Sequence, residues 1–199
     1  AMGHQCCPIP TAILSNHTEF PVYFFDDYTE KMTTYTDKWK ELGLSFDAIA
    51  TGFLGSEAQI GIVMEIVQKL KAEKTFVVVD PVMGDHGHAY ETYTPEMCEQ
   101  MKELVCMADV VLPNVTECCI LTDTPYREEN WTRKELLNMA MMLRLMGAKS
   151  VVITGVREES CYTNVVLEQG QYDAKFIRTR SSGGERPGTG DVFSSVVAG

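Results

Sequence analysis

Residues 75–80 (TFVVVD) include four consecutive apolar residues with no polar residue alternating between them. A strand has this composition when both of its faces are buried, as happens in a parallel sheet. Parallel neighbours must be joined by a crossover connection, which is usually a helix. This segment therefore predicts a sheet covered on both faces, with helices between its strands.

The rest of the chain agrees with this prediction, because segments of strand and helix periodicity alternate five times. Strands are predicted at 11–15, 46–51, 75–80, 109–112 and 149–154, and helices at 26–42, 56–72, 94–107, from about 115 and from 132. Ser56 with Gln59 and Thr132 with Glu135 fit capping boxes at two helix starts. Residues 162–167 and 171–178 predict a C-terminal β-hairpin joined at Gln169-Gly170. We expect one α/β domain over residues 1–199, with a mostly parallel central sheet and helices on both faces.

Composition excludes several classes of protein. The formal charge of −11 argues against nucleic acid as a partner. The chain contains no run of 18 apolar residues, so no membrane-spanning helix is predicted. No secretion signal is visible at the start. The seven cysteines are odd in number and form no C-x-x-C pair, which favours a reducing cytoplasm. An acidic chain that binds a phosphate compound needs local positive potential from backbone N–H groups, a metal ion or a few placed cations.

Gly188-Thr189-Gly190-Asp191 precedes an apolar helix and carries the strongest indication of chemistry. The glycines allow a tight turn with exposed N–H groups, and the helix start adds its positive dipole, which together favour an anion. Asp191 falls in the first turn, where a carboxylate could take a proton from an attacking hydroxyl. The alternative is that Asp191 only caps the helix.

Asn114 and Glu117 follow the strand predicted at 109–112 and lie one helical turn apart. An amide and a carboxylate on one face could hold a hydrated Mg²⁺, which binds through few carboxylates. The alternative is an asparagine cap beside a surface glutamate.

Asp80 ends the strand at 75–80, and a lone buried carboxylate needs a cation or hydrogen-bond donors nearby. Asp85 begins a loop that runs to Tyr90 and is a candidate flexible lid, or else an ordinary turn. A zinc site built from His86, His88 and Cys98 is a weak alternative.

Further polar and basic residues could line a phosphate site. Ser15-Asn16-His17-Thr18 would suit a hydroxylated heteroaromatic ligand, or would be only a polar turn. Thr154 ends a strand, and its hydroxyl could reach a phosphate. Four cations before the glycine turn could supply positive charge or form a solvated edge: Lys175, Arg178, Arg180 and Arg186.

Taken together, these motifs resemble the ribokinase-like superfamily. G-T-G-D at 188–191 and N-x-x-E at 114–117 resemble its catalytic and magnesium motifs. S-N-H-T at 15–18, T-G-F at 51–53, D-P-V-M-G-D at 80–85 and L-P-N at 112–114 resemble the pyridoxal kinase branch. The resemblance covers nearly the whole chain, with the motifs in the family's order.

The resemblance implies a role for each matched residue. Asp191 matches the base that activates the substrate hydroxyl, and Gly188, Thr189 and Gly190 match the anion hole. Asn114 and Glu117 match the magnesium and phosphate site. The remaining matches are Asp80 and Asp85 near ATP and the metals, Thr154 at a nucleotide phosphate, His17 and Thr18 at the pyridine, Tyr90 over the site, and Phe193 on the adenine side. Phe53 stands where many relatives have a tyrosine.

The implied activity is transfer of the ATP γ-phosphoryl group to the 5′-hydroxyl of pyridoxal, pyridoxine or pyridoxamine. Mg²⁺, a monovalent cation such as K⁺, and a homodimer are implied by the same resemblance. Two alternatives stay open, namely a hydroxymethylpyrimidine kinase of thiamine synthesis and a non-catalytic pyridoxal-binding protein. Family members also begin with another strand and extend beyond Gly199, so we expect that parts at both ends are missing here.

Overall fold

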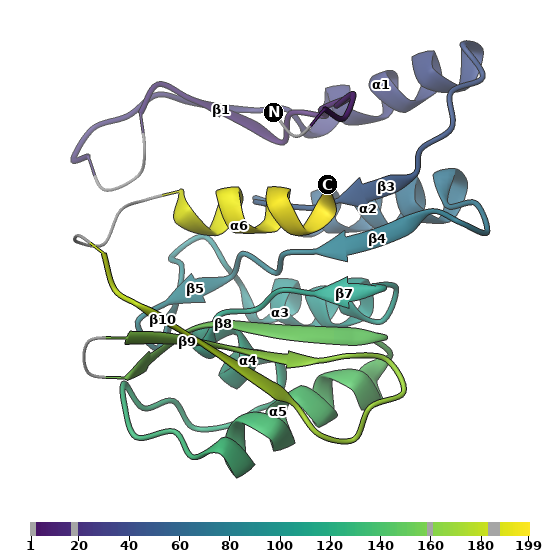
Figure 1. The fold of residues 1–199 in the computed structure, drawn as a ribbon. Helices are drawn as coiled ribbons and strands as arrows, with labels where there is room; N and C mark the ends of the chain where they lie inside the picture. The colour runs from purple at the N-terminus through teal and green to yellow at the C-terminus, as the bar shows by residue number, and fades with distance from the viewer. Residues whose placement is uncertain (1–2, 17–19, 159–160, 183–187) are drawn as a thin grey trace.

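The computed structural model describes residues 3–16, 20–158, 161–182 and 188–199. Its largest sheet has six strands in the order β10-β9-β8-β7-β4-β3 (Figure 1). Four of them are parallel: β3 (Ala48–Ala50), β4 (Phe76–Val79), β7 (Val110–Val111) and β8 (Ser150–Glu158). β9 (Cys161–Leu167) and β10 (Lys175–Arg180) extend it antiparallel at one edge. The α/β class, the mostly parallel sheet and the C-terminal hairpin are confirmed.

Helices connect the parallel strands, as the sequence predicts. α2 (Glu57–Leu70) joins β3 to β4, α3 (Pro95–Val105) joins β4 to β7, and α4 (Val115–Leu121) with α5 (Arg133–Met146) joins β7 to β8. These helices pack on one face of the sheet, whereas α6 (Thr189–Ala198) packs against β3 and β4 on the other (Figure 1). The capping box of Thr132 and Glu135 is present. None of the helices in the described ranges has the length and apolar character to cross a membrane.

β4 shows why an unbroken apolar run predicts a strand in the middle of a sheet. Val77 and Val79 belong to the large core under α2–α5. Val78, between them, points to the opposite face and belongs to a small core with Val110 and Leu112, covered by α6. All three valines of β4 are fully buried, so both faces of the strand exclude water.

The N-terminal part differs from the prediction. Its helix, α1, spans Thr29–Glu41 and does not start at residue 26. Residues Phe25–Asp27 form β2 instead, which pairs antiparallel with β1 (Ala12–Leu14) in a separate two-stranded sheet. The Asp27 carboxylate accepts a hydrogen bond from Thr29 N–H at 2.7 Å, just before the helix begins.

Gln59 connects this N-terminal part to α2. Its side chain is fully buried and donates to Thr11 O and Thr29 Oγ1 at 2.8 and 2.9 Å. The predicted capping box with Ser56 is therefore only half present. Ser56 Oγ accepts from Gln59 N–H, but the Gln59 side chain accepts from Gly55 N–H and not from Ser56.

β8 is longer than predicted, because it continues past Thr154 to Glu158. Its pairing with β9 has an irregularity between Ile153 and Val156, where Gly155 has a φ of +68°. A β-bulge of this kind lets a strand change direction and continue. Thr154 therefore lies within β8 and not at its end.

Asp109 stabilises the edge of the sheet where the parallel strands begin. Its buried carboxylate accepts from Val77 N–H of β4 at 2.8 Å and pairs with Lys71 at 3.2 Å and Lys149 at 2.6 Å. Burial alone would raise the pKa of this carboxyl, but the hydrogen bonds from Lys149, Val77 and Lys71 outweigh it and leave the pKa below its usual value. One neutralised carboxylate thus joins the starts of β4, β7 and β8.

Candidate active site

The opposite edge of the sheet gathers most of the predicted site residues. Asp80 follows β4, Asn114 follows β7, and a β-bridge pairs Asn114 with Thr154 of β8. Thr154 N–H donates to Pro113 O at 2.8 Å. The start of α6 lies on the same side of the molecule (Figure 1). Parallel strands bring their carboxyl ends to one edge, which is where α/β proteins bind ligands.

The glycine turn forms the start of α6. Gly188 has a φ of +82°, a left-handed conformation that glycine adopts without strain, and it is the N-cap of the helix. No side chain within the described part of the chain caps the first turn, so its first N–H groups can bind an anion. Asp191 is exposed in this turn, with one oxygen 3.8 Å from the point where a Cβ on Gly188 would lie. The alternative in which Asp191 is the capping residue is not what the structure shows.

Asp80 is a buried acid without a cationic partner. Its side chain is 8% exposed, and no lysine, arginine or histidine of the described residues pairs with it. Burial raises the pKa of Asp80 to about 6; a hydrogen bond with Ser194 opposes this shift, and the charge of Asp191 adds to it. Asp80 therefore lies close enough to Asp191 to feel its charge.

Glu117 is buried as well, contrary to the surface glutamate of the alternative interpretation. Its two oxygens accept from Met83 N–H at 3.1 Å and from Asn114 N–H at 2.8 Å. Asn114 returns a bond by accepting from Glu117 N–H, which completes a capping box at the start of α4. Burial raises the pKa of Glu117 well above its usual value, although both backbone N–H groups oppose the shift.

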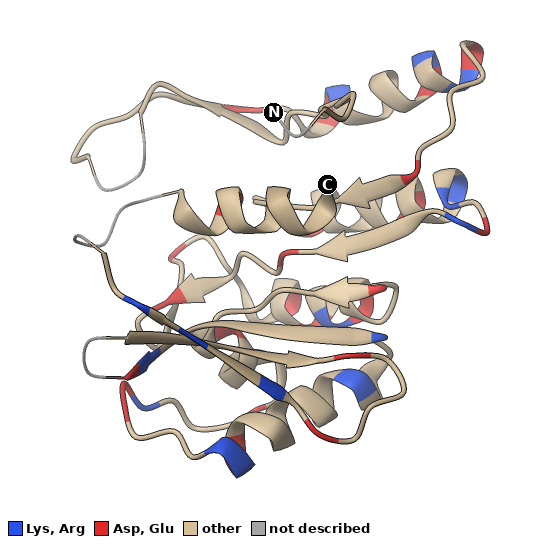
Figure 2. Cartoon of the chain, in the orientation of Figure 1, with Lys and Arg blue, Asp and Glu red and all other residues tan. Residues whose placement is uncertain are grey.

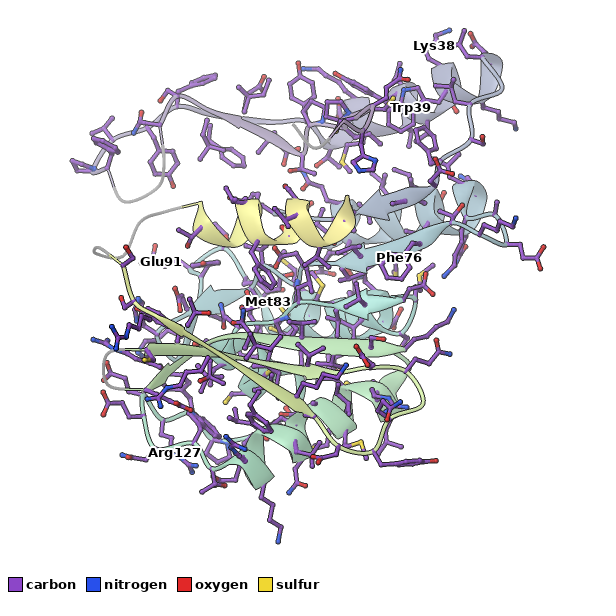
Figure 3. All side chains as sticks on the ribbon, viewed as in Figure 1. Lys38, Trp39, Phe76, Met83, Glu91 and Arg127 are labelled. Atoms are coloured by element: carbon purple, nitrogen blue, oxygen red, sulfur yellow. The ribbon has the colours of Figure 1, made fainter. Side chains whose placement is uncertain are left out.

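The segment predicted as a flexible lid is a small hairpin. β5 (Gly84–Asp85) pairs antiparallel with β6 (His88–Ala89), and Tyr90 N–H donates to Met83 O at 2.9 Å. Met83 is fully buried inside the molecule (Figure 3). Asp85 is exposed on the hairpin.

The acidic residues at this edge all influence the pKa of the Tyr90 phenol. Burial is the main cause that raises the pKa of its phenol. Negative charges raise it further, and they belong to Glu117, Asp85, Asp80 and Asp191. Acidic side chains from three separate segments therefore lie near enough to Tyr90 to influence its phenol.

Cations are scarce around this region. No lysine or arginine occurs between Lys74 and Lys102 or between Lys102 and Arg127. In Figure 2 the blue of basic residues is absent from α6 and from the segment after β4. Among the described residues, no group of three or more acidic, histidine or cysteine side chains could hold a metal ion by itself, which also removes the zinc alternative there.

Two of the four predicted cations pair with carboxylates of neighbouring strands and loops. Lys175 pairs with Glu168 at 2.9 Å and Arg178 with Glu158 at 3.3 Å. Arg180 is exposed, and Arg186 lies outside the described residues. Lys175 and Arg178 are therefore engaged by carboxylates of the β8–β10 edge.

Of the remaining predicted residues, the structure describes Phe193 and Phe53 and does not describe His17 and Thr18. The ring of Phe193 packs on the small core of Val78, Val110 and Leu112. Phe53 is half-buried, and its carbonyl accepts from Thr11 Oγ1 at 2.8 Å. His17 and Thr18, predicted for the pyridine pocket, lie outside the described residues.

Three hydroxyl residues at this edge were given no role by sequence reasoning, although Thr51 belongs to the T-G-F motif. Ser194 hydrogen-bonds Asp80, Thr51 Oγ1 accepts from Asp80 N–H at 3.3 Å, and Thr116 Oγ1 accepts from Gly87 N–H at 2.9 Å. Each is a common residue whose partner lies far along the chain. The helical spacing of Ser194, three residues after Asp191, is the one local signal that could have found it.

The chain is similar to a family of kinases and to several proteins of known structure. The family model described as phosphomethylpyrimidine kinase matches residues 3–199. A Bacteroides thetaiotaomicron protein assigned to the phosphomethylpyrimidine kinases and crystallised with pyridoxal is 38% identical, with a TM-score of 0.91 over 98% of this chain and 69% of that one. The pyridoxal kinase of Leishmania donovani in complex with ADP and pyridoxamine is 26% identical, with a TM-score of 0.76 over 96% and 70%.

A curated relative, the pyridoxine kinase of Bacillus subtilis, is 31% identical over 92% of this chain and 64% of its own length. The chain spans between about half and two thirds of the length of several curated relatives that it matches.

Proposed function

Because the chain belongs to the phosphomethylpyrimidine kinase family, whose model matches residues 3–199, we propose that it is an ATP-dependent kinase acting on a B6 vitamer. The reaction transfers the γ-phosphoryl group of ATP to the 5′-hydroxyl of pyridoxal, pyridoxine or pyridoxamine. The observation that carries this proposal is the uncapped glycine turn with Asp191 in its first helical turn, close to the buried Asp80 at one sheet edge.

Asp191 acts as the general base in this proposal. It is exposed beside the free N–H groups of the turn, so a bound alcohol can approach its carboxylate. The alcohol oxygen forms a bond to the γ-phosphorus while the bond to the β–γ bridging oxygen breaks. The alcohol proton passes to Asp191, and the N–H groups of 188–190 bind the negative oxygens of the phosphoryl group.

Mg²⁺ is the metal that this family implies. The donor set fits it, since Asp80 is an uncompensated buried carboxylate, Asp85 is exposed nearby, and Mg²⁺ usually binds through one or two carboxylates and substrate phosphates. Asp80 and Asp85 would hold the ion, which neutralises phosphate charge when bound. Each Glu117 oxygen accepts one backbone N–H bond, so Glu117 holds Met83 and Asn114 in place, and its remaining lone pairs could accept from waters of the ion's hydration shell.

The vitamer substrate is supported by the similarity to the Bacteroides protein crystallised with pyridoxal. A specific finding also favours a second candidate, because the matching family model is described as phosphomethylpyrimidine kinase. That candidate phosphorylates hydroxymethylpyrimidine, which also presents a primary alcohol on a heteroaromatic ring. The residues at 15–18 would select between the two rings.

A side-by-side assay tests these candidates. The full protein is supplied with Mg²⁺, ATP and either pyridoxal, pyridoxine or hydroxymethylpyrimidine, and ADP release is followed. We expect faster ADP release with the vitamers. Higher catalytic efficiency with the pyrimidine would establish the second candidate, and pyridoxal binding without ADP release would establish a non-catalytic binding protein.

A homodimer, a K⁺ requirement and a cytoplasmic location complete the proposal. Support for a partner surface comes from apolar side chains that are exposed around β1 and β2, among them Val22, Phe24 and Ile13 at 82, 65 and 46%. Light scattering of the purified protein tests for the dimer.

A further inference from the structure

The β5–β6 hairpin is attached to the first turn of α4 through its backbone. Asn114 Nδ2 donates to Gly84 O at 2.9 Å, and Glu117 Oε1 accepts from Met83 N–H just before the hairpin. Thr116 Oγ1 accepts from Gly87 N–H at the tip, also at 2.9 Å. Three residues of one helical turn therefore bind three successive parts of the segment.

The tip of the hairpin also has no room to move toward its neighbour. Gly87 has a φ of +83°, and a Cβ at this position would lie 2.4 Å from Cδ1 of the Tyr126 ring. Thr116 is 3% exposed, so water cannot replace its hydroxyl as the acceptor for Gly87 N–H. The backbone of Gly87 is thus in contact with the aromatic ring on one side and held by the threonine hydroxyl.

The two strands of the hairpin are equally close. A Cβ on Gly84 would lie 2.2 Å from His88 O, so only glycine permits this approach. Asp85 follows Gly84 directly, and Tyr90 follows β6 with its N–H bonded to Met83 O. The positions of Asp85 and Tyr90 therefore depend on where α4 holds the hairpin.

We propose that Thr116 and Tyr126 are positioning residues that fix this hairpin as a rigid wall of the site. They act through Gly87 and place Asp85 and Tyr90 beside the phosphate region. This proposal rests on the proposed function for the effect on nucleotide binding, but the attachment itself does not. It replaces the interpretation of the segment as a flexible lid.

Two substitutions separate the hydroxyl from the shape of Thr116. Thr116→Val keeps the shape and removes the acceptor for Gly87 N–H, whereas Thr116→Ser keeps the acceptor. Thr122→Val is the matched control, because Thr122 is a buried threonine at the other end of α4 whose hydroxyl donates to Cys118 O. Hydrogen exchange of residues 84–90 and affinity for the Mg²⁺ complex of a non-hydrolysable ATP analogue are measured for all four proteins.

We expect exchange of these amides to be about tenfold faster in Thr116→Val, since a buried donor loses its partner. Nucleotide affinity should fall about three- to tenfold in the same variant, while Thr116→Ser stays close to the unmodified protein. Thr122→Val should change neither reading. Unchanged exchange in Thr116→Val overturns the attachment.

Faster exchange with unchanged nucleotide affinity would overturn the positioning role. It would still support the attachment of the hairpin by Thr116. If the unmodified protein does not bind the nucleotide, the proposed function fails. In that event the positioning of a nucleotide site fails with it, and the exchange measurement still decides whether Thr116 holds the hairpin.

Discussion

The buried acids at the two edges of the parallel sheet differ in whether cationic side chains pair with them. Where the strands begin, Asp109 has two lysine partners and a backbone donor, and its pKa is lowered. Where they end, Asp80 and Glu117 have no cationic partner in the described residues, and their pKa values are raised. In the labelled view (Figure 3) Phe76, the first residue of β4, lies toward the first edge, away from the hairpin.

This difference separates stability from function within one sheet. An acid that pairs with cations of the fold contributes to stability and has no unpaired negative charge with which to bind a ligand. An acid that the fold leaves without a cation lowers stability until a ligand or metal supplies positive charge. The contrast between Asp109 and Asp80 therefore indicates which edge binds the substrate, and it can be tested by substitutions.

The largest effect should come from Asp191→Asn at the carboxyl edge. The substitution removes the proposed base and keeps the size of the side chain, so we expect turnover to fall by about 10²–10⁴-fold with little change in stability. Steady-state kinetics of ADP release measure it. Asp37→Asn, an exposed acid on α1, is the matched control. A loss below about tenfold would remove Asp191 from that role.

Asp109→Asn should lower stability and leave turnover unchanged, the reverse of the effect expected for Asp191→Asn. It breaks the pairs with Lys71 and Lys149 at the other edge, so we expect the free energy of unfolding to fall by roughly 2 kcal/mol. Turnover per folded molecule should stay the same. Because the folded pKa of Asp109 is depressed, its contribution is present above about pH 4 and is lost as pH falls through the folded value. Denaturant unfolding at pH 7 and pH 3 measures this, and an equal effect at both would contradict it.

Asp80→Asn should stabilise the metal-free protein slightly. The folded pKa of about 6 lies above the unfolded value, so the acid stays protonated in the fold while it ionises in the unfolded chain. Stability therefore falls as pH rises from about 4 to 6, and the ionised acid remains unfavourable above that range. We expect a gain of about 1 kcal/mol at pH 7.5, smaller than the roughly 3 kcal/mol that two pKa units represent.

Unfolding in the presence of a chelator at pH 7.5 and pH 4 measures this gain, which should disappear at the lower pH. A loss of stability at pH 7.5 would mean that Asp80 is paired as Asp109 is. The comparison between the two edges would then be wrong.

The sequence predicted the sheet because its signal is local. Val77, Val78 and Val79 are adjacent residues, and their unbroken apolar pattern is sufficient to place a strand between two cores. The glycine turn at 188–190 was found for the same reason, since glycine freedom and a helix start both lie within four residues.

The features that were missed depend on partners far along the chain. Glu117 is buried because Met83 N–H, 34 residues away, needs an acceptor, and no local pattern shows this. Phe25–Asp27 forms a strand through its pairing with residues 12–14, which overrides the helical periodicity. Propensity is a weak guide where a non-local contact decides the structure.

Proton release on nucleotide binding tests the account most directly. At pH 6 about half of the Asp80 carboxyls should be protonated, and binding of Mg²⁺ with an ATP analogue should ionise them. Calorimetry in buffers of different ionisation enthalpy measures the protons released. We predict that the unmodified protein releases about half a proton more per site than Asp80→Asn does. Equal release from the two proteins would show that Asp80 is not the unpaired acid that the bound cation neutralises.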